Sequence, residues 1–157
     1  MGRSADLADQ FEQALAAFAK AIEDHPDDKW NAKTEEGWTV AAAAQHVSGQ
    51  FPLEMEYITA AAEGKESPAY SWDDINAKND SRAAANTSVS KEQVLSELKE
   101  SGASVAAYVR GLSDEQLDST INLPLAGGAA VSTEQLLLGG VLIDHVNGHL
   151  KSLQAVA

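Results

Sequence analysis

Apolar residues recur at spacings of three and four through long stretches of this sequence. In the first stretch they are Leu7, Phe11, Leu15, Phe18 and Ile22. Such spacing places apolar side chains along one face of an α-helix. The pattern returns later in the chain, so we predict long helices over residues 5–24, 40–62, 90–111 and 133–153. A weaker pattern predicts a further helix over residues 73–86.

N-capping residues mark the starts of several of these helices. Thr39 precedes the second long stretch, and Ser-x-x-Gln capping boxes stand at residues 90–93, 113–116 and 132–135. Their side chains can bind the free backbone amides in the first turn of a helix. Pro52 lies inside the second stretch, where it removes a backbone donor and crowds the preceding turn. We therefore predict a kink at Pro52.

The helical stretches are long enough to form a bundle. No segment alternates apolar and polar residues in the manner of a half-buried strand, and residues 119–131, with Pro124 and two glycines, are expected to form a loop. Four long helices with short to medium connections predict an all-α fold, a four-helix bundle. The length of 157 residues fits a single domain over residues 1–157.

Composition excludes several classes of function. The sequence has no cysteine and a formal net charge of -13. Disulfides, thiolate metal ligands and a cysteine nucleophile are therefore excluded. An acidic surface repels phosphate backbones and anionic lipids, so we expect neither nucleic acid nor a membrane as partner. No apolar run approaches the roughly 20 residues of a membrane span, and no signal-like segment begins the chain. We expect a cytoplasmic protein.

Three of the four histidines lie in apolar helical stretches. His145 and His149 are four residues apart and therefore project side by side from one helical face. His46 follows a run of four alanines and precedes Gly49, a pattern that keeps its helix thin enough to approach the last helix. A core-facing imidazole needs a polar partner. One divalent metal ion shared by His46, His145 and His149 would satisfy all three rings.

A set of three neutral imidazoles leaves an open coordination position, as in catalytic zinc sites. Zinc or nickel is the metal we expect first, and iron, cobalt or manganese would also accept the set. The structural alternative is that these histidines are buried and bonded to carbonyls, to a serine or to one another. The spacing also matches zinc peptidases of the HExxH type, but the segment reads His-Val-Asn-Gly-His. It lacks the general-base glutamate, so that class is excluded.

Other polar and aromatic residues are candidates for roles beside the site. Trp38 is a candidate for the mouth of a substrate pocket, although packing is the commoner role of tryptophan. Asn76 and Arg82 are expected on one helical face, where Arg82 would suit a substrate carboxylate; a solvated face is the alternative. Asp144 points about a quarter-turn away from the histidine face, which favours a surface position or a place behind a metal ligand over the role of general base. His25, at a helix end, is expected to be exposed and outside the site.

Several short motifs resemble the DinB/YfiT-like superfamily. They are Gly37-Trp38-Thr39 leading into the helix of His46, and the C-terminal pair His145-x3-His149. Within that superfamily, Trp38-Thr39-Val40, Asn76-Ala77 and residues 112–117 look like the N-terminal domain of mycothiol-dependent maleylpyruvate isomerase-like proteins. The resemblance covers nearly the whole chain.

The resemblance implies a four-helix bundle of up-down-down-up topology that forms a homodimer. It implies a divalent metal ion held by His46, His145 and His149. It also implies thiol-dependent transferase or isomerase chemistry on a small-molecule substrate, with mycothiol, bacillithiol or a similar low-molecular-weight thiol as cosubstrate. A non-catalytic bundle that binds a metal or small ligand and a metal-dependent hydrolase are the alternatives.

Overall fold

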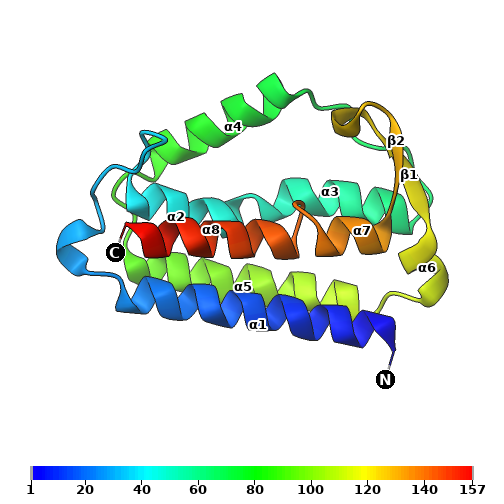
Figure 1. Cartoon of the computed structure of the whole chain (residues 1–157), viewed down its shortest axis with the longest axis horizontal. Coiled ribbons are helices and arrows are strands. Elements are labelled where there is room, and N and C mark those ends of the chain that lie inside the picture. The colour runs from blue at the N-terminus through cyan, green and yellow to red at the C-terminus, as the bar shows by residue number, and fades with distance from the viewer. Residues whose placement is uncertain (1, 157) are drawn as a thin grey trace.

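The computed structural model describes residues 2–156, which are mostly helical (Figure 1). Four long segments lie side by side: α1 (Arg3–Asp24), α2 (Val40–Gly49) continued by α3 (Phe51–Ala62), α5 (Lys91–Arg110), and α7 (Thr133–Leu138) continued by α8 (Ile143–Ala155). The shorter elements are α4 (Trp72–Ala85), α6 (Asp114–Asp118), the strands β1 (Thr120–Leu123) and β2 (Ala129–Ser132), and the 3-10 turns Asp27–Lys29 and Pro124–Ala126.

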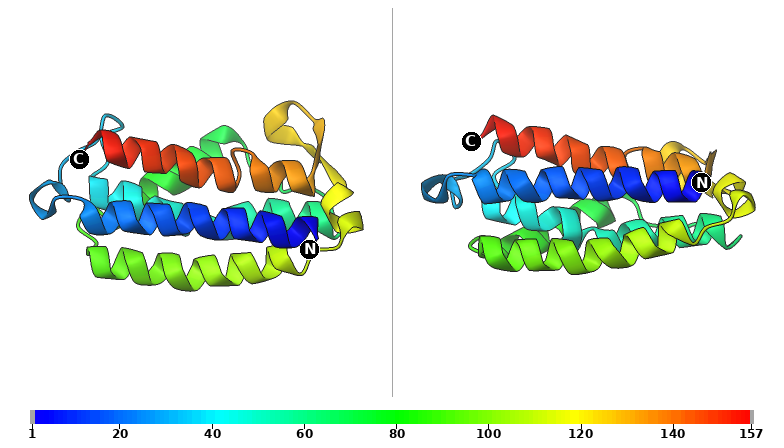
Figure 2. Two further views of the ribbon diagram at one scale, coloured as in Figure 1. Left: turned by 60° about the horizontal axis from the view of Figure 1, so that its bottom comes forward. Right: turned by 90° about the horizontal axis from the view of Figure 1, so that it is seen from below.

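The long segments follow an up-down-down-up order (Figures 1 and 2). The α2–α3 segment runs opposite to α1, α5 runs parallel to α2–α3, and α7–α8 returns parallel to α1. Helices α1 and α2 each pack against both α5 and α8. The α4 helix lies outside the bundle, contacts α2, and carries the chain back to the end where α5 starts. The predicted four-helix bundle and its topology are confirmed.

One apolar core fills the space between the four segments. Its largest fully buried side chains include Phe11, Phe18, Phe51, Ile22, Ile58 and Leu117. Phe11 of α1 packs edge-on against Phe51 of α3, with ring centroids 5.7 Å apart. The apolar stripe predicted for the first helix is thus the face that α1 turns toward the core.

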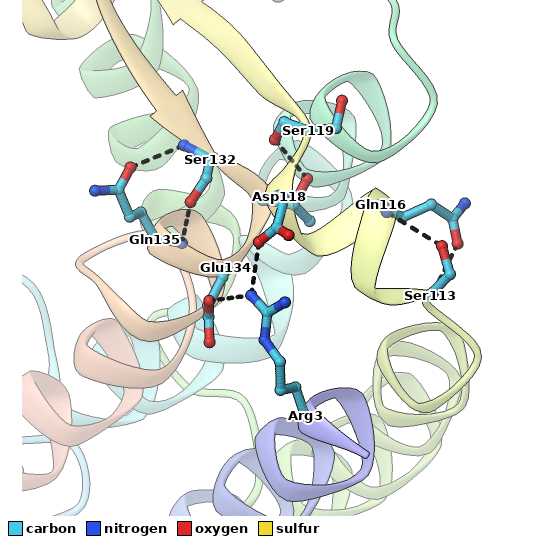
Figure 3. A network of polar contacts seen from close by, with 9 residues as sticks. Arg3, Ser113, Gln116, Asp118, Ser119, Ser132, Glu134 and Gln135 are labelled. Carbon is cyan, nitrogen blue, oxygen red and sulfur yellow. Dashed lines mark hydrogen bonds and ion pairs between the residues drawn. The ribbon is translucent and has the colours of Figure 1, made fainter.

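The predicted caps hold the helix starts in place. The Oγ1 atom of Thr39 accepts a hydrogen bond from the amide of Ala42 at 3.1 Å and donates to the carbonyl of Thr87 at 2.7 Å. Reciprocal capping boxes form at Ser113–Gln116 and Ser132–Gln135 (Figure 3). Beside them, Arg3 forms ion pairs with Asp118 and Glu134 that tie α1 to α6 and α7 (Figure 3).

The second long helix is interrupted close to the predicted kink. The break falls at Gln50, and Pro52 lies in the first turn of α3. Backbone N–H groups in the first turn of a helix have no acceptor within the helix, so a proline there costs no hydrogen bond. The chain therefore breaks just ahead of the proline rather than at it, and α3 continues the course of α2 (Figure 1).

The expectation of one continuous helix over residues 133–153 was wrong. Helix α7 ends at Leu138, and α8 starts at Ile143. Gly139 has an extended backbone, with φ -80° and ψ -161°. Glycine is a poor helix former because it loses more backbone entropy than other residues. Gly139 and Gly140 together therefore permit the break.

The expectation of an irregular loop over residues 119–131 was also wrong. Strands β1 and β2 pair antiparallel, with Thr120 opposite Ser132 and Leu123 opposite Ala129. Each strand has four residues, too few for an alternating pattern to stand out. The turn between them uses Gly127 and Gly128 at φ +68° and +84°, values that glycine adopts without steric cost. None of the described helices has the length and apolar character needed to cross a membrane.

Replacing Thr39 with alanine should destabilise the bundle at the start of α2. The Thr39→Ala variant loses both the cap on Ala42 and the bond to Thr87, so we expect the free energy of unfolding to fall by about 1 kcal/mol. Urea denaturation followed by circular dichroism measures this change. Thr39→Ser keeps the hydroxyl and should remain close to the native value. An alanine variant as stable as the native protein would contradict this role of the cap.

Candidate metal centre

Three imidazole rings meet between α2 and α8. His46 comes from α2, and His145 and His149 come from successive turns of α8. The Nε2 atom of His145 lies 3.3 Å from Nε2 of His46 and 3.0 Å from Nε2 of His149. One ligand atom from each ring lies within 4.8 Å of the others. The structure therefore brings together the three histidines that the sequence singled out.

Small residues of α2 lie beside this approach. Ala43 and Ala44 share a cavity wall with His149 of α8, and α2 packs directly against α8. On α8 the spacing of four residues puts His145 and His149 one turn apart on the same face. His46 is buried, at 6% exposed, and the other two rings are half-buried.

The arrangement of nitrogens suits a metal ion better than it suits hydrogen bonding alone. Each ring nitrogen either donates one hydrogen or accepts one, so Nε2 of His145 cannot donate to both neighbours at once. A tetrahedral zinc ion with Zn–N bonds of about 2.0–2.1 Å separates its nitrogen ligands by about 3.3 Å. The two Nε2 separations of 3.3 and 3.0 Å are close to that value. The three residues fit a divalent metal ion.

The rings are also in the protonation state that a metal requires. Burial, together with the neighbouring His149, His145 and Arg82, lowers the pKa of His46 to about 3. Burial lowers the pKa of His145 to about 4, and burial with the neighbouring His145 lowers that of His149 to about 4. All three rings are neutral near pH 7. Neutral imidazole offers a lone pair to a cation.

A buried carboxyl group stands behind one of the rings. The Oε1 atom of Glu54, on α3, lies 2.7 Å from Nδ1 of His145. Glu54 is only 5% exposed, and its Oε2 has no hydrogen-bond partner among the described residues. Burial raises the pKa of this carboxyl group well above its ordinary value, and the positive charge of Arg82 offsets part of the effect. At 2.7 Å the contact is close but not aligned as a hydrogen bond. A bound cation would favour the ionised form of Glu54, and a carboxylate behind a histidine ligand orients the ring and makes its other nitrogen a better donor to a metal.

Glu54 was missed in the sequence analysis, although a signal was present. It lies three residues after Phe51 and four before Ile58, both of which belong to the buried face of α3. An acidic residue at such a core-facing position is rare unless it has a partner. The position of Glu54 on the apolar stripe could therefore have marked it as a companion of the histidines.

Trp38 and Arg82 lie next to the centre. The ring of Trp38 packs on His46 with centroids 5.3 Å apart, and its Nε1 donates to Asp80 at 3.2 Å. Arg82 reaches from α4 toward α2 and donates to Gln50. Asn76 is exposed on α4, so its predicted part in substrate binding stays a prediction.

Asp144 and His25 lie outside the centre. Asp144 is exposed, in agreement with a surface position. The expectation that His25 is exposed was wrong, because it is only 3% exposed. Its ring lies against Trp30 with centroids 6.1 Å apart, and its Nδ1 is 3.2 Å from the carbonyl oxygen of Pro26. The turn after α1 folds back and covers the ring of His25. The position of His25 at a helix end, just before Pro26, gave no sign of this contact.

A cavity of about 250 Å³ adjoins the centre. His149 forms part of its wall, Val40 and Leu153 supply apolar surface, and Glu35 and Glu36 add charge. The cavity places space for part of a small molecule beside one of the candidate ligands.

The metal-free protein should lose stability as the pH falls from about 6.5 toward 4. The site histidines stay neutral in the fold, with pKa values of about 3 or 4, while the unfolded chain takes up protons near pH 6.5. Each histidine then lowers the free energy of unfolding by up to about 1.4 kcal/mol per pH unit. Glu54 opposes this trend, because its raised pKa keeps it protonated in the fold when the unfolded chain has ionised.

Urea unfolding in the presence of a chelator, between pH values of about 7 and 5, measures this dependence. The His149→Gln variant removes one buried titrating ring, so its stability should fall less steeply with decreasing pH than that of the native protein. Equal slopes for the two proteins, or a native protein whose stability is constant over this range, would contradict the assignment of neutral buried rings.

Comparison with solved structures places this arrangement in a known fold. YfiT from Bacillus subtilis, described as a probable metal-dependent hydrolase with an unusual four-helix bundle topology, matches with a TM-score of 0.70 and 17% identity, over 99% of this chain and 87% of its own. The mycothiol-dependent maleylpyruvate isomerase matches with a TM-score of 0.66 and 13% identity, over 98% of this chain and 59% of its own. The colibactin self-resistance protein ClbS, in complex with a double-stranded DNA, matches with a TM-score of 0.70 and 13% identity, over 98% of this chain and 94% of its own.

At these identities the likeness establishes the fold. No curated protein matches the sequence. The sequence model of the DinB superfamily matches residues 10–153, a span that contains α2, most of α8 and the three site histidines. The chain belongs to the DinB superfamily.

Proposed function

We propose that this protein is a divalent-metal-dependent enzyme that activates a low-molecular-weight thiol for S-transfer or isomerisation of a small molecule. The observation that carries the proposal is the convergence of Nε2 atoms from His46, His145 and His149. When bound, a divalent ion would lower the pKa of a coordinated thiol or water, as it does in other metal enzymes.

Residues of the chain have distinct parts in this proposal. His46, His145 and His149 would hold the ion from one side and leave the other side for a substrate. Glu54 would position His145 through its Nδ1 atom, and Trp38 would limit the movement of His46 by packing on its ring. The cavity beside His149 would take the apolar part of a substrate.

The placement of carboxylates favours thiol chemistry over hydrolysis. Among the described residues, Glu54 is the only acid with a carboxyl oxygen within 4.0 Å of a site-histidine nitrogen. It lies at Nδ1 of His145, behind the ring and away from the converging Nε2 atoms. Hydrolysis needs a group that takes a proton from water, whereas a thiol ionises far more readily. The metal-dependent hydrolase and the non-catalytic binding module remain alternatives, and the homodimer, zinc or nickel as the ion and the cytoplasmic location remain predictions.

The purified protein should contain about one divalent ion per chain. Three imidazole ligands are the usual protein share of a catalytic zinc site, so His145→Ala should abolish or greatly weaken binding. Elemental analysis of protein prepared without added metal measures the content and identifies the ion. His25→Gln is the matched control, because it replaces the one histidine outside the centre and should retain the ion. Equal metal content in His145→Ala and the native protein would rule out the site.

The Glu54→Gln variant refines this test. A carboxylate behind a metal ligand typically contributes 10- to 100-fold to metal affinity, and we expect a loss in this range by competition with a chelator. Glu56→Gln makes the same change two residues along α3 at an exposed position and should leave the affinity unchanged. Equal affinities for the two variants would show that Glu54 does not position His145.

The activity itself can be measured with a thiol and an electrophilic acceptor. The metal-loaded protein should accelerate conjugation of mycothiol or bacillithiol to a fluorogenic electrophile such as monochlorobimane, and His46→Ala should reduce the rate to the uncatalysed level. Turnover of an ester or amide without a thiol would favour the hydrolase instead. A tightly bound ion with no turnover of either kind would favour the binding module. Either result would overturn the proposed activity.

A further inference from the structure

Arg82 forms no ion pair with any described residue, although the protein is strongly acidic. The chain has 24 acidic residues against 11 basic ones. Arg3 pairs with Asp118 and Glu134, and Arg110 pairs with Asp9 and Glu12. Among residues 2–156, Arg82 has no carboxylate within 4.0 Å. It is half-buried, burial lowers its pKa, and the more distant Glu54 offsets only part of that effect. A charged group held partly out of water without a counter-ion is costly.

The guanidinium is held in place by neutral groups and keeps donors free. Its Nη1 atom donates to Oε1 of Gln50 and to Oδ1 of Asn79, each at 3.2 Å. Gly49 makes room for the side chain, because a Cβ at that position would lie 2.5 Å from Cδ of Arg82. Nε and Nη2 donate to no acceptor among the described residues. These two atoms form the edge of a guanidinium that can bind both oxygens of a carboxylate.

Arg82 lies in the neighbourhood of the metal centre. Gln50, whose side chain accepts from Arg82, lies one helical turn after His46. The backbone N–H of Gln50 donates to the backbone carbonyl of His46 at 2.9 Å. The charge of Arg82 also contributes to the lowered pKa of His46 and acts on Glu54. Arg82 therefore lies close enough to influence groups at the centre without bonding to any of them.

A bound divalent ion would leave the centre positive, because the acids that act on its side chains, Glu54 and Glu36, supply at most two negative charges against three positive ones. A divalent ion carries two positive charges, Arg82 adds one, and the three imidazoles add none while they are neutral. A ligand that brings a negative group in addition to a thiolate would compensate this excess, whereas a neutral or cationic ligand would not.

We propose that Arg82 makes the site selective for an anionic small molecule, whose carboxylate binds to Nε and Nη2 while another group of the same molecule reaches the metal. The inference rests on the proposed function and narrows its substrate class. Gln50 and Asn79 act as positioning residues for the guanidinium, and Gly49 provides the space for it.

The cobalt(II)-loaded protein provides a test with an optical signal. We would titrate it with 3-mercaptopropionate and, separately, with the methyl ester of the same thiol, and follow the sulfur-to-cobalt charge-transfer band. The two probes differ mainly in the charge of one group. The native protein should bind the acid at least tenfold more tightly than the ester, since a charge-assisted bidentate pair contributes about that factor. The Arg82→Gln variant should bind both probes about equally.

Two further variants separate the possible causes. Arg110→Gln removes an arginine far from the centre, so it should keep the native preference and exclude an effect of net charge alone. Arg82→Lys keeps the charge without the planar fork and should give an intermediate preference. A preference for the acid that persists in Arg82→Gln would mean that the carboxylate binds the metal directly, and would overturn the proposal.

The remaining outcomes distinguish this inference from the proposed function. If the native protein gave a charge-transfer band with both probes and bound acid and ester with equal affinity, the role of Arg82 would be overturned and thiol binding would stand. The absence of a band with either probe would overturn thiol binding and, with it, the selectivity. The native comparison needs no variant, so it remains decisive if Arg82→Gln fails to fold or to take up cobalt.

Discussion

The close packing of α2 against α8 is the contact on which the candidate site depends. Ala43 and Ala44 of α2 lie on the side that faces His149, where small side chains let two helices approach, and Nε2 of His46 lies 3.3 Å from Nε2 of His145. The up-down-down-up order makes these helices neighbours although His46 and His145 are 99 residues apart in the chain. A bulkier face on α2 would separate the rings and leave each of them as an isolated buried imidazole.

The environment of the three rings favours neutral imidazoles that can bind a cation. Burial keeps the imidazoles neutral and available as ligands. Glu54 reaches the centre from α3 and Arg82 from α4, so segments on both sides of the Gln50 break and the helix outside the bundle contribute to one environment. The α4 helix thus has a second role besides connecting two parallel segments. It carries Arg82, the one arginine that has no acidic partner among the described residues.

Long apolar periodicity was sufficient to predict the bundle and the starts of its helices. The stripe of α1 and the cap at Thr39 depend on neighbouring residues in the chain, and such local features can be recognised in a single sequence. The errors arose where short segments or glycines decided the outcome. The β1–β2 hairpin has four-residue strands, and the break at Gly139 costs little backbone energy, so neither produces a strong periodic signal.

For the candidate site, the sequence by itself determined the residue types, the i,i+4 pair on the last helix, and the apolar setting that made a third histidine relevant. Only the tertiary structure decided that Glu54 stands behind His145, that Trp38 packs on His46, and that Arg82 lies near them with Nε and Nη2 bound to no described acceptor. It also showed that His25 is covered by the turn after α1. Spacing within one helix fixes which side chains share a face, whereas contacts between helices depend on how their faces pack, which no local pattern encodes.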